Sequence, residues 1–111
     1  MVKQGDIVFV DFDPALGHEQ KGRRPAVVIS NSEFISRTKG LAIMLPITST
    51  IHPGFPLHVD LQGRTKTKGQ ILCEQPKVID TNSKDYVLIE SVPEDILKKV
   101  IDIVMLEISY N

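Results

Sequence analysis

Short runs of β-branched and other apolar residues, separated by turn-forming residues, dominate the chain up to Ile89. Runs of this kind, bounded by Gly, Pro, Asn and Asp, are typical of β-strands. The pattern predicts strands over Ile7–Phe12, Pro25–Ser30, Leu41–Ile47, Leu57–Leu61, Gln70–Ile79 and Tyr86–Ile89. Continuous apolar residues in Pro25–Ser30 favour burial on both faces. In Leu57–Leu61, alternation with His58 and Asp60 predicts a half-exposed strand, and Pro76 predicts a bulge or an edge.

Two segments have helical patterns. Asn31 or Ser32 can cap a short helical piece over residues 33–39, which Gly40 would terminate. Further on, Ser91 and Glu94 fit a capping box, with Pro93 tolerated in the first turn. Behind them, apolar residues recur at helical spacing: Ile96, Leu97, Val100, Ile101, Val104 and Met105. Many short strands and one substantial helix predict a mainly β fold, a small twisted antiparallel barrel or strongly bent sheet with short helices and the C-terminal helix packed on it.

Composition narrows the classes of protein to consider. A chain of 111 residues with 41% hydrophobic residues predicts one domain over residues 1–111. Thirteen basic and fourteen acidic residues give a formal charge of -1, so any polyanion would be held locally and not by a broad positive field. The lone Cys73 excludes an internal disulfide. No apolar stretch approaches the roughly 20 residues that span a membrane, and the N-terminus has no secretory layout. We therefore expect a cytoplasmic protein with no membrane contact.

The usual signals for metal and nucleotide chemistry are missing. His18, His52, His58 and the single cysteine show none of the paired spacings of zinc sites, so we expect no metal. A glycine-rich phosphate loop and a serine nucleophile elbow are absent too. Candidate chemistry is therefore confined to polar groups in the loops and at the strand ends.

The first such cluster is GHEQKGRRPAVVIS, residues 17–30. Pro25 biases the preceding residue toward extended backbone, which holds Arg24 at a strand entrance while Arg23 points to the other side. A guanidinium fixed there is a planar set of donors suited to phosphate or carboxylate. Glu19 could pair with Arg24, as an exposed ion pair worth about 0–1 kcal/mol. On composition alone, a merely solvated loop is the commoner interpretation.

Two further clusters interrupt strands with polar residues. PITST, residues 46–50, closes the third predicted strand with three hydroxyl residues. These can hold a phosphate oxygen, although such runs are more often plain turn formers. In CEQPK, Glu74 and Gln75 interrupt an apolar strand, so one of them points inward or into a groove. Glu74 is then either a satisfied half-buried carboxylate or an acid, base or hydrogen-bonding group of a site.

Taken in order, GDIVFVDFDPALGHEQKGRRPAVVIS, LPITST, ILCEQPKVID and SVPEDILKKV resemble the MazF/PemK family of toxin endoribonucleases over nearly the full length. The resemblance implies the small twisted barrel shared with the CcdB and Kid toxins, as a two-fold homodimer with an RNA groove across the interface. It also implies metal-independent cleavage of single-stranded RNA, usually mRNA, at short motifs, with no cofactor. A cognate MazE-like antitoxin would cover the groove with an acidic tail, and DNA would be contacted only through the antitoxin complex.

Carried over position by position, the resemblance assigns catalysis to Arg24, before Pro-Ala-Val-Val, and to Thr48, after a Pro-x pair, with Glu19 as the third catalytic residue. The residues it assigns to RNA binding are Gln20, Arg23, Ser49, Glu74, Gln75 and Lys77. The chain departs from the pattern at Leu72, where a relative has been given an acid, and at Pro76, where an aliphatic residue is common.

RNA can supply its own nucleophile, because its 2′-hydroxyl can attack the adjacent phosphorus once aligned. We hypothesise that Arg24 braces the phosphorane, that Thr48 hydrogen-bonds a phosphate oxygen, and that Glu19 accepts the proton or orients Arg24. Products would be a 2′,3′-cyclic phosphate and a 5′-hydroxyl. Lys21, Arg23, Arg24 and the 64–68 turn would form a basic rim.

Two rival interpretations stay open. One is a non-catalytic CcdB-like toxin that binds a topoisomerase, although this chain lacks the Trp-containing tail by which those toxins resemble one another and ends in Ser-Tyr-Asn. The other is a catalytically dead barrel that binds RNA or a partner protein.

Overall fold

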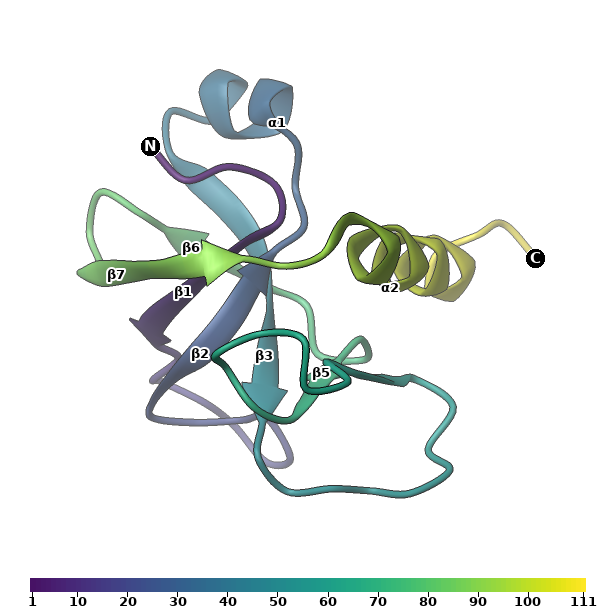
Figure 1. Cartoon of the computed structure of the whole chain (residues 1–111). Coiled ribbons are helices and arrows are strands. Elements are labelled where there is room, and N and C mark those ends of the chain that lie inside the picture. The colour runs from purple at the N-terminus through teal and green to yellow at the C-terminus, as the bar shows by residue number, and fades with distance from the viewer.

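A computed structural model describes residues 1–111. Its elements, in chain order, are β1 (Asp6–Asp11), β2 (Arg23–Val28), α1 (Ser32–Arg37), β3 (Leu41–Thr48), β4 (His58–Asp60), β5 (Gln70–Leu72), β6 (Lys77–Asp80), β7 (Tyr86–Ser91) and α2 (Glu94–Glu107). All strand pairs are antiparallel. The predicted mainly β fold is confirmed as a strongly twisted, barrel-like sheet that does not close (Figure 1).

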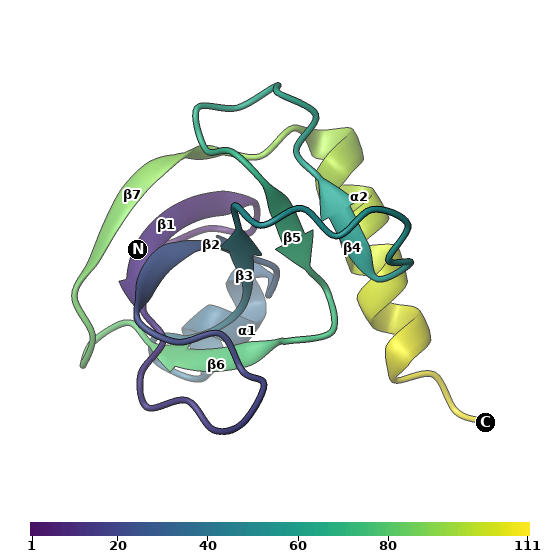
Figure 2. The ribbon, with the colours of Figure 1, turned by 90° about the horizontal axis from the view of Figure 1, so that it is seen from below.

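The long strand β3 organises this sheet. The strand order is β4-β5-β3-β2-β1-β7, and β6 pairs with β3 outside that path. One edge of β3 therefore pairs with β2, whereas the other edge pairs first with β6 and then with β5. Because β3 pairs with both β6 and β5 along one edge, it has to bend. In the view of Figure 2 the strands accordingly curl round on themselves.

Both faces of the sheet are covered. Along β2, Ala26 and Val28 pack in one apolar cluster, and Val27 lies in another on the opposite face. The first cluster includes Ile35 of α1, and the second includes Ile96 of α2. Figure 2 accordingly shows α1 behind the curled strands and α2 alongside β4. Burial of this strand on both faces, predicted from PAVVIS, is confirmed.

Two predictions about local structure are wrong. The single strand expected over Gln70–Ile79 is two strands, because residues 73–76 form a turn that Gln75 N closes on Leu72 O at 3.2 Å. Proline cannot donate to a ladder, and β5 and β6 pair with different parts of the bent β3. The capping box also fails: Ser91 is paired with Asp6 as the last residue of β7, and α2 begins after Pro93 with no side-chain cap.

The first helix follows its prediction closely. Asn31 is the N-cap, and its side chain accepts from Phe34 N at 2.9 Å. After the C-cap Thr38, Lys39 takes the left-handed conformation with φ +59°, and Gly40 follows with φ +115° and donates its N–H to Ile35 O. The helix therefore ends before Gly40 as predicted, although the first left-handed residue is Lys39. Neither α1 nor α2 is long and apolar enough to cross a membrane.

Candidate functional site

Two of the three residues predicted to be catalytic, Arg24 and Thr48, lie at the ends of neighbouring strands. β2 and β3 pair in a register that places Ala26 opposite Pro46 and Val28 opposite Met44. Extending this register by two residues places Arg24 opposite Thr48. The start of β2 and the end of β3 lie at the same end of the sheet, away from α1 (Figure 1). The pairing thus places the backbones of Arg24 and Thr48, which are far apart in the sequence, at the same end of the sheet.

Local hydrogen bonds hold both groups. Arg24 donates to Lys21 O through Nε at 3.2 Å and through Nη2 at 3.0 Å, which leaves its remaining N–H groups for a ligand. Thr48 is 6% exposed, and its Oγ1 accepts from Thr50 N at 3.1 Å. This bond uses the hydroxyl oxygen of Thr48 as an acceptor and leaves its proton without an acceptor within the protein.

A polar cleft of about 170 Å³ lies between the β1–β2 loop and the β5–β6 turn. Its lining residues are Phe12, Glu19, Gln20, Glu74, Gln75, Pro76 and Lys77. Gln20 N donates to Gln75 Oε1 at 2.8 Å and joins the two walls. A neighbouring hollow shares several of these residues and adds Leu16 and His18. The structure therefore brings together four of the six residues predicted to bind RNA, Gln20, Glu74, Gln75 and Lys77, although more than fifty positions separate Gln20 from the others in the sequence.

Two lysines fix the β1–β2 loop. Lys77 Nζ donates to Phe12 O and to Pro14 O, each at 2.7 Å. Lys84 Nζ donates to Asp11 O at 3.0 Å and also to Asp13 O. Lys77, predicted from the sequence to bind RNA, thus has two backbone acceptors in the free protein, and its contact with RNA stays a prediction.

The ion pair suggested between Glu19 and Arg24 does not form. Glu19 Oε1 instead accepts from Leu16 N at 2.7 Å, and Glu19 N donates back to Leu16 O at 3.1 Å. This local turn satisfies the carboxylate within its own loop, while Lys21 O holds Arg24. Glu19 is exposed at the cleft and does not orient Arg24 by direct contact.

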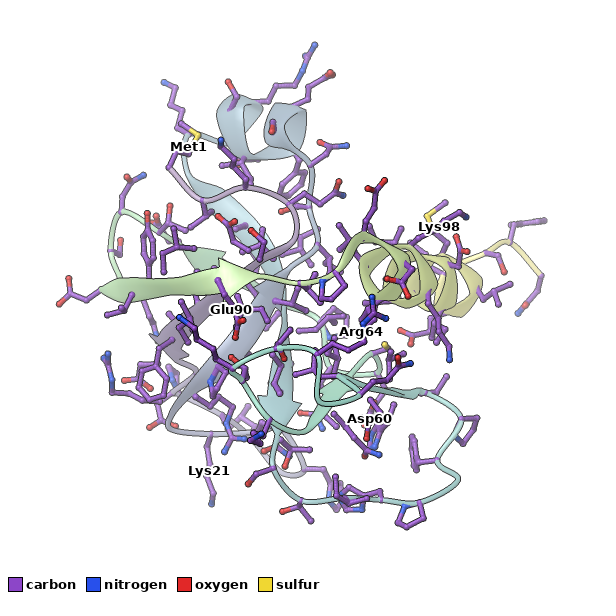
Figure 3. All side chains as sticks on the ribbon, viewed as in Figure 1. Met1, Lys21, Asp60, Arg64, Glu90 and Lys98 are labelled. Atoms are coloured by element: carbon purple, nitrogen blue, oxygen red, sulfur yellow. The ribbon has the colours of Figure 1, made fainter.

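The predicted basic rim is only partly present. Arg23 is exposed and lies with its guanidinium 5.2 Å from the centre of the Phe9 ring, on the opposite side of β2 from Arg24 as predicted. Ser49 is exposed directly after Thr48. Arg64, however, which is labelled in Figure 3, forms a bidentate ion pair with Asp95 of α2, with two hydrogen bonds of 2.8 Å each. The positive charge of Arg64 is therefore paired within the protein and does not contribute to the predicted rim.

The turn that contains Lys66, Thr67 and Gly69 packs against the backbone of Thr48. A Cβ added at Gly69 would lie 2.0 Å from Thr48 O, and Gly69 has φ +123°, so only glycine fits. Glu90 of β7, labelled in Figure 3, anchors the same turn by accepting from Lys66 N at 3.0 Å and Thr67 N at 2.8 Å. Burial opposes ionisation of Glu90, but these hydrogen bonds outweigh it and lower its pKa.

His58 is buried, although the alternating pattern of its strand predicted a solvent-facing residue. The His58 side chain is 5% exposed, and its Nε2 lies 2.9 Å from Glu74 Oε2. The Phe55 ring stacks on the imidazole with centroids 4.2 Å apart, which excludes water. His58 Nδ1 and Glu74 Oε1 are buried without partners. A histidine in one short strand and a glutamate in an apolar run were the only signals in the sequence.

Glu74, Glu107 and the Cys73 thiol influence one another electrostatically. Burial, with repulsion from Glu74, raises the pKa of Glu107. Burial also raises the pKa of the Cys73 thiol to about 12, assisted by Glu107 and Glu74. Cys73 is therefore a packing residue and not a nucleophile. No group of three or more His, Cys, Asp or Glu side chains is placed to hold a metal ion.

Comparison with known proteins identifies the family. Residues 3–107 match the family described as PemK-like, MazF-like toxin of type II toxin-antitoxin system. The chain belongs to this PemK/MazF toxin family. It is 34% identical to endoribonuclease PemK of Escherichia coli over 104 residues, which cover 90% of this chain and 77% of that protein.

Solved structures of PemK/MazF toxins show the same fold. The crystal structure of MazF (Form-I) from Deinococcus radiodurans superposes with a TM-score of 0.86 at 31% identity, covering 96% of this chain and 94% of that one. The MazE-MazF (Form-II) crystal structure from the same organism gives a TM-score of 0.80 at 25% identity, with coverage of 99% and 97%. This chain thus has the fold of a toxin that has been crystallised together with MazE.

Proposed function

We propose that this PemK/MazF family member is an endoribonuclease toxin that cleaves single-stranded RNA, mRNA above all, at short sequence motifs without a metal or cofactor. The observation that supports the proposal is the antiparallel pairing of β2 with β3, in which Arg24 near the start of β2 and Thr48 at the end of β3 lie at the same end of the sheet, together with the polar cleft that Glu19 and Gln20 line. Relatives such as PemK of E. coli are named endoribonucleases, which supports the choice of RNA as the substrate.

In the proposed mechanism, the RNA 2′-hydroxyl attacks the adjacent phosphorus and the bond to the 5′-oxygen breaks. Arg24 stabilises the charge of the phosphorane and of the departing 5′-oxygen by hydrogen bonds from its free N–H groups, while the Thr48 hydroxyl donates a hydrogen bond to a non-bridging oxygen. The 5′-oxygen takes its proton from a water molecule as it leaves. The products are a 2′,3′-cyclic phosphate and a 5′-hydroxyl.

The proton of the 2′-hydroxyl needs an acceptor. Glu19 lines the cleft and is exposed, so its carboxylate can accept that proton directly or through one water. Arg24 cannot serve as the base because a guanidinium stays protonated in proteins. Gln20, Gln75 and Glu74 would hold the RNA on either side of the cleft, and Arg23 and Ser49 would extend the contact at the strand ends.

Partner proteins complete the proposal: the chain forms a homodimer, a MazE-like antitoxin neutralises it, and DNA is contacted only through that complex. Crystallisation of the similar D. radiodurans MazF with MazE supports an antitoxin partner. Large apolar side chains exposed on β7 and on or after α2 supply surface for protein contacts: Val87, Leu88, Met105, Leu106 and Ile108.

The test is incubation of the purified protein with a long single-stranded RNA in EDTA, followed by mapping of the cuts and their ends. We expect cuts at a recurrent motif with 5′-hydroxyl ends. Arg24→Ala and Thr48→Ala should each lower the cleavage rate about 100- to 1,000-fold. Arg37→Ala is the matched control, because Arg37 is 78% exposed on α1 at the other end of the sheet, and it should cleave as the parent does.

Two results would contradict the proposal. Arg24→Ala and Thr48→Ala variants that fold, dimerise and cleave as fast as the parent would remove the assigned chemistry. Intact RNA after incubation with a folded parent dimer would favour a non-catalytic toxin, whose binding to a topoisomerase would then be measured.

A further inference from the structure

The loop between β3 and β4 carries an exposed aromatic ring in a fixed position. Phe55 is 44% exposed, and one face of its ring stacks on His58 with centroids 4.2 Å apart and planes 26° apart. His52 approaches the imidazole edge-on at 5.3 Å. Because one face is stacked on His58, the 44% of Phe55 that is exposed lies on the rest of the ring, which is accessible to a ligand.

Buried groups fix this ring from behind. The side chain of His58 is 5% exposed, and its Nε2 lies within hydrogen-bond distance of Glu74 Oε2, at 2.9 Å. The loop backbone adds bonds from His52 N to Gln70 Oε1 at 3.2 Å, from Phe55 N to His52 O and from His58 N to Phe55 O. The ring is therefore placed before any ligand arrives, which removes an ordering cost from binding.

Glu74 connects the ring to the cleft. It lines both the 170 Å³ cleft and the neighbouring hollow. The contacts from Phe55 to His58 to Glu74 thus run from the surface of the loop to the wall where Gln75 and Glu19 lie. Most of the residues that line these two hollows are polar, so the surface on the Glu74 side of the ring suits a ligand with a flat face and polar edges. Directly after Phe55 in the chain, Pro56 and Leu57 line an apolar hollow with Ile103 and Leu106 of α2.

We propose that Phe55 is a nucleobase-stacking site, in which the free face of its ring takes one unstacked base of single-stranded RNA. His58 is a positioning residue that holds the ring and links it to Glu74. Aromatic side chains bind single strands in this way because every base has a π-face that stacks without regard to sequence. This proposal rests on the proposed function, since it assumes that RNA occupies the adjacent cleft.

The experiment uses a short RNA that contains the mapped motif, with a 2′-deoxy sugar at the cut to prevent cleavage. 2-Aminopurine replaces one base at a time, and its fluorescence reports stacking. We expect one position to be quenched on binding to the parent and to Phe55→Tyr. Phe55→Leu should abolish that quenching and weaken binding about 5- to 100-fold.

Two histidine variants separate positioning from general stability. His58→Leu should reduce the quenching at the same base, because Phe55 loses the ring that holds it. His52→Leu should leave quenching and affinity unchanged, since His52 touches His58 only at an edge. Thermal melting of every variant shows that the comparison is made between folded proteins. If His58→Leu does not fold, His58→Gln keeps a donor for Glu74 and replaces it in the test.

The outcomes distinguish this proposal from the proposed function. If Phe55→Leu binds the RNA as tightly as the parent and shows the same quenching, the stacking site is wrong while the endoribonuclease proposal stands. The exposed ring would then be assigned to a protein contact. If the folded parent neither cleaves nor binds RNA, both proposals fail together.

Discussion

The close contact between Gly69 and Thr48 makes a quantitative prediction. A Cβ at position 69 would lie 2.0 Å from Thr48 O, whereas Cβ atoms in proteins do not approach closer than 3.0 Å. Gly69→Ala must therefore displace the Thr48 backbone, or its own turn, by at least about 1 Å. The bonds from Glu90 to Lys66 and Thr67 restrain the turn, so we expect Thr48 to take much of the shift.

A displacement of this size at a catalytic group costs about 100-fold in rate, equivalent to roughly 2.7 kcal/mol in the activation free energy. The assay is the single-turnover rate of RNA cleavage at saturating enzyme, with thermal melting to confirm folding. Gly63→Ala is the matched control: Gly63 also has a positive φ, +66°, but an added Cβ would meet nothing within 4 Å.

Gly63→Ala should lose about 1–2 kcal/mol of unfolding free energy from the left-handed backbone. Gly69→Ala should lose more, because the added Cβ also meets the Thr48 backbone, and only Gly69→Ala should lose activity. Equal cleavage rates for the two alanine variants would refute the argument that Gly69 positions Thr48.

Two further predictions concern stability and reactivity. Glu90→Gln should lower the free energy of unfolding by about 1 kcal/mol at pH 7. Because the pKa of Glu90 is lowered in the folded protein, the stability difference between parent and variant should be complete above the ordinary glutamate pKa and should fade as the pH falls through the lowered pKa of the folded state. Urea unfolding at pH 7 and pH 3 measures the two free energies of unfolding. A stability difference that does not change with pH would contradict the prediction. A raised pKa of about 12 for Cys73, against 9.0 ordinarily, implies a roughly thousandfold smaller thiolate fraction at pH 8. A thiol reagent should therefore label the native protein far more slowly than the urea-unfolded protein, and equal rates would show that the thiol is exposed.

Local sequence patterns were sufficient where a structure depends on neighbouring residues. The run PAVVIS predicted a strand buried on both faces, and Asn31 with Gly40 predicted the ends of the short helix. Binary pattern and cap chemistry act over a few positions, so a single sequence contains them. The extended backbone before Pro25 likewise predicted that Arg23 and Arg24 would point to opposite sides.

Features that depend on contacts between distant segments could not be predicted. The break between β5 and β6 follows from the bend of β3, which no local pattern records. The two carbonyl contacts of Lys77 require a loop that lies more than sixty positions earlier in the sequence. Burial of His58 likewise follows from the fold of a loop that places Phe55 over it, since alternation alone would leave the imidazole in water.

Arg24 and Thr48 lie on paired strands, whereas Phe55 lies on the loop of residues 49–57, and this difference affects how such a protein can diverge in evolution. Arg24 and Thr48 lie at the ends of strands whose register is set by buried pairs deeper in the sheet. Phe55, by contrast, is carried by a connection that crosses the surface and closes on His58. Insertions, deletions and exchanges in that connection leave the register of β2 and β3 intact. Descendants of one ancestor could therefore acquire different surfaces around an unchanged pair of strand ends, and a designer could graft new connections there in the same way.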